Sequence, residues 1–430
     1  MAKARLRREA NLSAFAAVIV VFLSLSSCAK SPVSSSTSKT SASQLSCQAA
    51  RFSGSVAPKS KISGMTYGGS YSDYVPMPAF PWQGAFESKN VTVGSQRTGV
   101  GLDATLFYPA GNSLPCSLPG VVIIPGSMIG VQTQVQWVAR DLAGHGYVAL
   151  SIDPMGEGHS PQISLPPCNS TKSTSSGIPD GFGGNNSVSM SGDLINWPTN
   201  TSGAVCDSQS TDVSGLNYLD ALESGIDWLT STSDPELNIV NPSKIAVVGH
   251  SLGAIVVSFA QSIDKRIKAV VGLDNLSSTV TGDLGSPRCA GNISTGYITP
   301  RVPALGEASE YCSSQQSYPA SAKETAALRW KSFGIPSMEV VFAGATHFSF
   351  AQDSVKNFGG TEVQFQEFSY YIKAFVDLFL KGDVTAAKLL DATTVLGEPL
   401  SSILSSRFSS GILLPSFLPV CSDLLTCNTK

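Results

Sequence analysis

Apolar and polar positions follow two alternating patterns along the chain from about residue 91 onward. Solid β-branched runs at 120–126 (GVVIIPG) and 244–249 (KIAVVG) are typical of strands that are buried on both faces. Between such runs, 135–146 and 216–231 carry apolar residues at the three- and four-residue spacing of amphipathic helices. This repeated strand–helix–strand order predicts an α/β domain with a mostly parallel central sheet and helices on both faces.

Other segments extend this pattern. Alternation of apolar and polar residues in NVTVGS (90–95) and LDATLFYPAG (102–111) predicts an antiparallel pair of strands. A long amphipathic helix is predicted at 362–382. Further buried strands are predicted at 147–153, 268–274, 301–306 and 337–344, and a further helix is predicted from about 252 to 262.

Two regions lack this periodicity. Residues 154–212, directly after the strand that ends at Asp153, are rich in Gly, Ser, Asn and Pro and form an insertion of unusual length for a compact domain. Residues 383–430 are expected to form a C-terminal extension with two short helices, which leaves 47–382 as the α/β domain. Ligands of open parallel sheets bind at the carboxyl ends of the strands, so we expect the insertion to act there as a lid or pocket wall. A solvated surface loop is the alternative.

The N-terminus has the pattern of an export signal. Residues 1–27 combine basic side chains with an apolar run, 14–25, that is too short for a comfortable membrane span. The sequence LSSC, which ends at Cys28, resembles a bacterial lipobox, whose cysteine is diacylated and becomes the mature N-terminus. An ordinary secretory signal that holds a cysteine is the alternative. Residues 28–46 are Ser/Thr-rich and predict a flexible tether, so we expect a cell-envelope protein that is held at the membrane by its lipid alone.

The cysteine count agrees with export. The chain has nine cysteines, and eight remain when the proposed lipid site Cys28 is set aside. An even number in an exported chain predicts disulfides. Eight cysteines permit 105 connectivities, and the sequence leaves the choice open. Pairing of near neighbours suggests Cys168–Cys206, Cys289–Cys312 and Cys421–Cys427, and leaves Cys47–Cys116. The sequence has no CxxC motif and no His/Cys cluster, so we expect disulfides rather than a zinc site.

Composition and charge narrow the range of partners. The chain has 430 residues, of which 42% are hydrophobic, so it can bury a sizeable core. Its formal net charge of −3 supplies no electrostatic reason to expect nucleic acid or an anionic membrane surface as a partner.

The stretch VVGHSLGA contains a candidate nucleophile, Ser251, between Gly249 and Gly253. A predicted strand precedes this Gly-x-Ser-x-Gly motif and a predicted helix follows it, which is the context of a nucleophile elbow. In such an elbow the serine backbone is strained so that its hydroxyl projects above the sheet. The alternative is a serine in a tight structural turn.

A nucleophilic serine needs a base, and the chain has only four histidines. His250 occupies the position before the serine and is expected to point elsewhere, and His145 is expected to pack or cap at a helix C-terminus. His159 opens the insertion and is expected to be a loop residue. His347 follows the last predicted strand, in FAGATHFSF, which places it late in the chain at the carboxyl edge of the sheet. We therefore predict His347 as the base.

Two carboxylates could orient this base, and the residues by themselves leave the choice open. Asp274 closes the strand after the elbow helix, and Glu310 lies just beyond the following strand. The developing negative charge on the substrate needs backbone amides. Leu252, directly after the nucleophile, is one predicted donor, and Ser127, after the first buried parallel strand, is the other.

A resemblance to a known family bears on the choice of acid. The stretches GAF, VTV, LFYP, VVIIPGS, LAGHGYVALSID, GHSLG, KAVVGLD, SEY and GATHFSF occur in this order between about 84 and 382. This set resembles the branch of α/β-hydrolases that holds platelet-activating-factor acetylhydrolases, dienelactone hydrolase-like enzymes, bacterial cutinases and poly(ethylene terephthalate) hydrolases. In the polyester hydrolases the acid follows the SEY strand, where this chain has Cys312. In the acetylhydrolases it follows the preceding strand, in a pair like Leu273–Asp274, so the resemblance implies Asp274 and an α/β-hydrolase fold.

We therefore expect a serine carboxylic ester hydrolase that uses Ser251, His347 and Asp274 and forms an acyl-enzyme. No metal or organic cofactor is expected, and the substrate is expected to be a small-molecule or lipid-like ester. An acyltransferase or a serine peptidase of the same superfamily are alternatives, as is a catalytically dead surface binding protein. The sequence leaves open the ester, its acyl chain length and the oligomeric state.

Overall fold

A computed structural model shows the architecture of the chain. The described residues are 47, 50–58, 65–66, 80, 84–96, 98–111, 113–126, 131–163, 216–231, 235–274, 276–278, 298–311, 324–352 and 359–412. All of them belong to the unit Ala42–Lys430. The predicted signal segment 1–27, the predicted lipidation site Cys28, the predicted tether 28–46 and the predicted oxyanion donor Ser127 lie outside the described residues.

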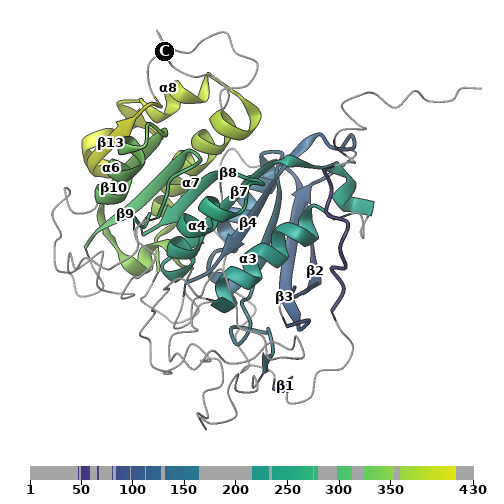
Figure 1. Ribbon diagram of the computed structural model, residues 1–430. Coiled ribbons are helices and arrows are strands. Elements are labelled where there is room, and N and C mark those ends of the chain that lie inside the picture. The colour runs from purple at the N-terminus through teal and green to yellow at the C-terminus, as the bar shows by residue number, and fades with distance from the viewer. Residues whose placement is uncertain are drawn as a thin grey trace, which may run out of the picture. The chain divides into compact units, whose positions relative to one another are not determined.

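A sheet of nine strands forms the centre of this unit, in the order β13-β10-β9-β8-β7-β4-β5-β3-β2 (Figure 1). From β10 to β5, neighbouring strands run parallel, whereas β3, β2 and β13 join the two edges in antiparallel orientation. The prediction of a mostly parallel α/β sheet with one antiparallel pair near the N-terminus is confirmed. The strands are β2 (Phe86–Gly94), β3 (Gly101–Pro109), β4 (Leu118–Ile124), β5 (Val148–Ile152), β7 (Val240–His250), β8 (Ile267–Leu273), β9 (Ala304–Tyr311), β10 (Ser337–Thr346) and β13 (Leu404–Ser410).

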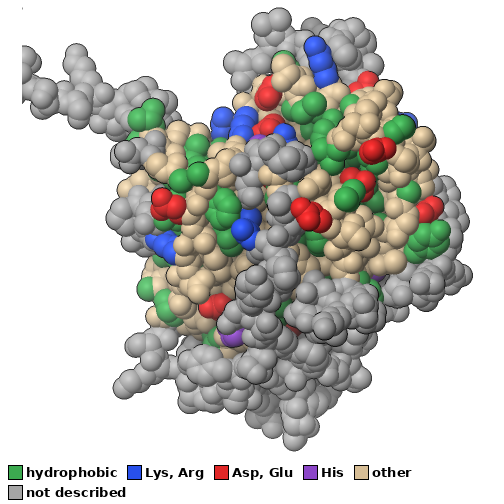
Figure 2. All heavy atoms as spheres, turned by 180° about the vertical axis from the view of Figure 1, so that it is seen from behind, with side chains coloured by type: hydrophobic (Ala, Val, Ile, Leu, Met, Phe, Trp, Pro, Cys, Tyr) green, Lys and Arg blue, Asp and Glu red, His purple; other side chains and the backbone are tan. Residues whose placement is uncertain are grey.

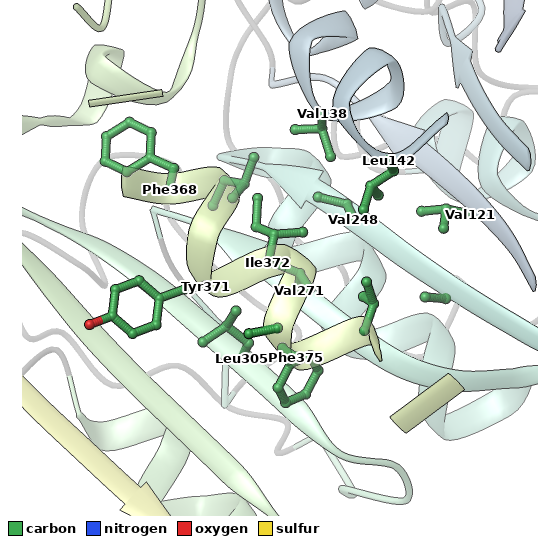
Figure 3. Packing of buried hydrophobic residues seen from close by; sticks show 14 of the residues in the cluster. Val121, Val138, Leu142, Val248, Val271, Leu305, Phe368, Tyr371, Ile372 and Phe375 are labelled. Atoms are coloured by element: carbon green, nitrogen blue, oxygen red, sulfur yellow. The ribbon is translucent and has the colours of Figure 1, made fainter. Parts of the chain in front are cut away.

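Helices cover both faces of the sheet, because successive residues of each buried strand point to opposite sides. Val122 and Ile124 of β4 join one apolar cluster, whereas Val121 and Ile123 join the other. The first cluster contains the apolar faces of α3 (Leu216–Leu229), α4 (Leu252–Ile263) and α6 (Thr325–Ser332). The second contains α2 (Gln136–Gly144) and α7 (Glu362–Val376). In Figure 3, Ile372 and Phe375 of α7 lie beside the apolar side chains of the underlying strands.

The C-terminal extension adds more to the sheet than the sequence indicates. Besides the two short helices that were predicted, α8 (Ala386–Leu390) and α9 (Leu400–Ile403), it forms β13, which pairs antiparallel with β10. The strand has the sequence LSSRFSS and a mixed burial pattern, so its local signal is weak. β13 is an edge strand that is defined by its backbone hydrogen bonds to β10. It therefore depends on its tertiary context and not on the β-propensity of its own residues. A two-stranded turn, β11 (Thr394–Val395) and β12 (Glu398–Pro399), precedes it.

The first residues of the predicted insertion are part of the packed domain. Residues 154–160 are buried except for His159, which is exposed as expected of a loop residue. They lead into β6 (Gln162–Ile163), which pairs antiparallel with β1 (Met65–Thr66). The remainder of 154–212 lies beyond the part of the chain that the structure describes, and so do the three cysteine pairs Cys168–Cys206, Cys289–Cys312 and Cys421–Cys427.

The fourth predicted cysteine pair is present. Cys47 and Cys116 form a disulfide that ties the N-terminal segment to the loop before β4. Beside it, the guanidinium of Arg51 donates at 2.8–3.2 Å to four backbone carbonyls: those of Ser231, Leu237 and Asn238 in the connection from α3 to β7, and that of Val240, the first residue of β7. The disulfide and this arginine together anchor the N-terminal segment to the domain.

The described surface carries both signs of charge. On the face shown in Figure 2, basic and acidic side chains are interspersed between apolar and uncharged ones. Within the described ranges, no helix has the length and apolar character needed to cross a bilayer. The same ranges contain no group of three or more His, Cys, Asp or Glu side chains that could hold a metal ion.

Candidate active site

Ser251 occupies the sharp turn between β7 and α4. Its backbone angles are φ 54° and ψ −115°, a conformation that side-chain-bearing residues rarely adopt and that costs of the order of 1–3 kcal/mol. The neighbouring glycines are required by close backbone approach. A Cβ on Gly253 would lie 2.5 Å from the carbonyl oxygen of Pro125, and a Cβ on Gly249 would collide with the backbone of Gly253.

The chain that leaves β4 packs directly against this turn. A Cβ on Gly126 would lie 2.9 Å from Cβ of Ser251 and 2.9 Å from Nδ1 of His250, so only glycine fits there. The amide of Ser251 donates to the carbonyl of Leu273 at the end of β8, 3.0 Å away. The serine is therefore held between the carboxyl ends of β4 and β8.

His347 and Asp274 meet at the same edge of the sheet. His347 begins a short 3₁₀ turn directly after β10, and its Nδ1 lies 2.5 Å from Oδ2 of Asp274. A carboxylate accepts hydrogen bonds, so Nδ1 carries the hydrogen and a neutral imidazole keeps its lone pair on Nε2. The side chain of His347 is 20% exposed and that of Asp274 is 7% exposed, so the imidazole is the more accessible of the two groups.

Neighbouring strands fix the carboxylate of Asp274. Its backbone has φ 47°, and its amide donates to the carbonyl of Glu307 in β9 at 2.7 Å. Its Oδ1 accepts two hydrogen bonds from Ser309, from the amide at 2.9 Å and from the hydroxyl at 2.6 Å. Ser309 is the first residue of the SEY stretch, and sequence reasoning assigned it no role of its own. Oδ1 is thus engaged by β9, while Oδ2 contacts His347.

The alternative acid, Glu310, is placed elsewhere. Its Oε2 accepts a hydrogen bond from the amide of Gly344, 2.7 Å away, near the end of β10. Side chains of successive strand residues point to opposite faces, and Glu310 follows Ser309 directly. Because Ser309 faces Asp274, Glu310 faces away from it.

The predicted oxyanion donors fall at the start of a helix and after β4. Leu252 is the first residue of α4, and the first amides of a helix have no carbonyl partner within it. This leaves its N–H available beside Ser251. Ser127 lies outside the described residues, but the preceding residue, Gly126, is described and contacts Ser251 as stated above.

Two of the other histidines, His250 and His145, have structural roles, and His250 touches the site. His250 is 4% exposed, and its Nε2 lies 3.0 Å from the carbonyl oxygen of His347, with the two rings 5.0 Å apart. The expectation that it points away from the serine is correct, but sequence reasoning missed that it holds the backbone of His347. His145 is the C-cap residue of α2, in line with its predicted capping role, and its Nδ1 lies 3.0 Å from the carbonyl of Asp141.

The assembled residues have the elements of covalent acyl transfer. They comprise a strained serine, a histidine whose Nδ1 faces a buried carboxylate, and a helix N-terminus beside the serine. No model of a known protein family matches the chain, and no curated protein sequence matches it.

Proposed function

We propose that this protein is a serine carboxylic ester hydrolase with an α/β-hydrolase fold. The observation that carries the proposal is the 2.5 Å contact between His347 and Asp274 at the sheet edge that also presents the strained Ser251. The order of strands and site residues along the chain supports the proposed fold. The turn with the proposed nucleophile follows a central parallel strand, and the proposed acid and base follow later strands, in the order Ser, Asp, His.

The proposed reaction has two halves. Oγ of Ser251 attacks the ester carbonyl while Nε2 of His347 takes the hydroxyl proton, and the amides of Leu252 and Ser127 stabilise the oxyanion. The C–O bond to the alcohol then breaks as His347 returns the proton to the leaving alcohol. Water, deprotonated by His347, attacks the acyl-enzyme and releases the carboxylic acid and free Ser251. Asp274 holds the imidazole tautomer and stabilises the imidazolium in both halves.

The backbone strain at Ser251 favours an enzyme over a binding protein with an inactive site. A non-glycine residue in such a conformation persists only where the surrounding structure enforces it, and such residues cluster at functional sites. An acyltransferase would use the same groups with an alcohol in place of water, and a peptidase would use them on an amide. Both remain secondary proposals.

The test is hydrolysis of p-nitrophenyl esters of increasing acyl chain length, with S251A as the matched control. We expect the wild-type protein to hydrolyse at least the shorter esters, and S251A to lose nearly all of this activity. A fluorophosphonate should label the wild type at Ser251 and leave S251A unlabelled. A wild-type protein that neither hydrolyses these esters nor reacts with the probe would contradict the proposal.

We further propose that the mature protein is anchored to the bacterial cell envelope by a lipid on Cys28, as the LSSC stretch indicates. In a bacterial host, C28S should move from the membrane to the soluble fraction. Mass spectrometry of the N-terminal peptide should find a diacylated cysteine in the wild type. An unlipidated peptide together with unchanged fractionation would contradict the anchor.

A further inference from the structure

A buried tyrosine beyond the proposed triad contacts the backbone next to Ser251, and a buried glutamate contacts the hydroxyl of that tyrosine. The hydroxyl of Tyr218, in the first turn of α3, lies 2.9 Å from the carbonyl oxygen of Gly126 and 3.0 Å from Oε1 of Glu157. Tyr218 is 1% exposed and Glu157 is 2% exposed. Buried polar groups are costly unless they are hydrogen-bonded, so these contacts help to hold both side chains in place.

The carbonyl of Gly126 is part of the peptide group that joins Gly126 to the next residue, and Gly126 packs against Ser251. Because a peptide group is planar, fixing the direction of its C=O also fixes its N–H. The N–H of this group belongs to Ser127, the second proposed oxyanion donor. Tyr218 therefore contacts the group whose orientation decides whether that donor is aimed at the reacting carbonyl.

The hydrogen count decides how the three groups are connected. A phenol has one hydrogen, yet Tyr218 has two acceptors within hydrogen-bond distance. A carbonyl oxygen can only accept, so the contact with Gly126 requires Tyr218 as the donor, and the contact with Glu157 is then a hydrogen bond only when Oε1 of Glu157 carries a proton.

The turn that carries Glu157 is itself held in place. Nδ2 of Asn217, the neighbour of Tyr218 in α3, donates to the carbonyl of Met155 at 2.8 Å. At the other end of the turn, the carboxylate oxygens of Asp153 accept hydrogen bonds from the amides of His159 and Gln132. The turn is thus fixed to α3 on one side and to the segment after β4 on the other.

We propose that Tyr218 is a positioning residue of the active site, which fixes the Gly126 peptide group through its hydroxyl, and that protonated Glu157 fixes the direction of that hydroxyl. This inference rests on the proposed esterase function. As positioning residues, the two act through the Gly126 peptide group, so the expected effect is on transition-state stabilisation and appears in kcat rather than in KM.

The experiment compares Y218F with Y147F, using the full-length protein and the most reactive p-nitrophenyl ester. Loss of one oxyanion donor costs about 10²–10³-fold in kcat, and a misdirected donor should cost less. We therefore expect Y218F to lower kcat by about 10- to 100-fold while KM changes by less than about twofold. Tyr147 is the matched control, because it is also a buried tyrosine but donates to Asp377, away from the site; Y147F should keep the wild-type kcat.

A second pair of variants tests Glu157 without relying on the stability of Y218F. The Gln amide of E157Q can still donate to the phenolic oxygen, so kcat should stay within about threefold of wild type, whereas E157L cannot donate and should resemble Y218F. Thermal unfolding checks that each variant is folded. A wild-type kcat in folded Y218F, or an equal loss in E157Q and E157L, would overturn this inference while Ser251-dependent hydrolysis stands. Absence of that hydrolysis in the wild type would instead overturn the proposed function.

Discussion

Nδ1 of His347 lies 2.5 Å from Oδ2 of Asp274 across 73 residues of sequence. The two residues follow different strands, β10 and β8, and β9 lies between those strands in the sheet. Ser309 of β9 donates hydrogen bonds from its amide and from its hydroxyl to Oδ1, the other carboxylate oxygen of Asp274. The contact therefore depends on three strands, and it places Asp274 rather than Glu310 in reach of the imidazole.

The first prediction concerns this carboxylate. D274N should lower kcat by about 10⁴-fold, because loss of the orienting carboxylate leaves the imidazole in the wrong tautomer. E310Q should change kcat by less than about threefold, since Glu310 contacts the amide of Gly344. Steady-state kinetics on one ester checks both variants, and a larger loss in E310Q than in D274N would contradict the assignment.

His250 should support the base without exchanging protons with it. H250A leaves the carbonyl of His347 without the donor that lies 3.0 Å away, and an unsatisfied buried acceptor costs about 1–3 kcal/mol. We expect kcat to fall about tenfold in H250A and to recover partly in H250Q, whose side chain retains a donor. H145A is the control, because His145 lies at the C-terminal end of α2, and its kcat should match wild type. Equal kcat values in H250A and wild type would show that this contact has no effect on catalysis.

Replacing Gly253 by alanine should destabilise the protein, although the same change within a helix normally stabilises it. The new Cβ would lie 2.5 Å from the carbonyl oxygen of Pro125 and 2.7 Å from that of Ile124, and backbone atoms cannot move away cheaply. We expect G253A to lose roughly 2–3 kcal/mol in chemical denaturation and to lose esterase activity. At Gly111 nothing lies within 4 Å of an added Cβ, so G111A should cost only about 1 kcal/mol, from its φ of 96°. A G253A protein as stable as G111A would contradict the close approach at the elbow.

The buried carboxyl group of Asp153 should make stability depend on pH. Burial raises its pKa to about 7, against the lowering effect of hydrogen bonds from the amides of Gln132 and His159. Because the pKa is higher in the folded than in the unfolded state, the stability that this group contributes is full below about pH 4 and is lost as pH rises through about 7. The free energy of unfolding of wild type minus that of D153N should therefore fall by a few kcal/mol from pH 4 to pH 8. Urea denaturation at several pH values measures it, and a difference that is constant with pH would contradict the raised pKa.

The disulfide between Cys47 and Cys116 should stabilise the domain by closing a loop with a sequence separation of 69 residues. The double variant C47S/C116S should lose about 2–4 kcal/mol of unfolding free energy. Reductant should lower the Tm of the wild type toward that of the variant. Any shift that reductant still causes in the variant would come from other cysteines, and a wild-type Tm in the variant would show that the bond contributes little.

The sequence by itself determined the order of the buried strands and amphipathic helices, the elbow at Ser251 and the position of His347. Each of these depends on a local pattern: runs of β-branched residues, helical spacing, and glycines on either side of a serine that follows a strand. Such patterns report burial and periodicity over a few neighbouring residues. Pairing of near-neighbour cysteines also suggested the disulfide Cys47–Cys116, but the sequence left the connectivity open, and the structure shows this pair.

Only the tertiary structure decided which side chains meet. Asp274 and Glu310 both follow strands at the same sheet edge, and their separation depends on strand register and on the face to which each side chain points. The strand β13 forms because it can pair with β10 at the edge of the sheet. The contacts of Tyr218 with Gly126 and with Glu157 join segments that are 92 and 61 residues apart in the sequence. Contacts at such separations arise from the packing of whole elements, which no short stretch of sequence encodes.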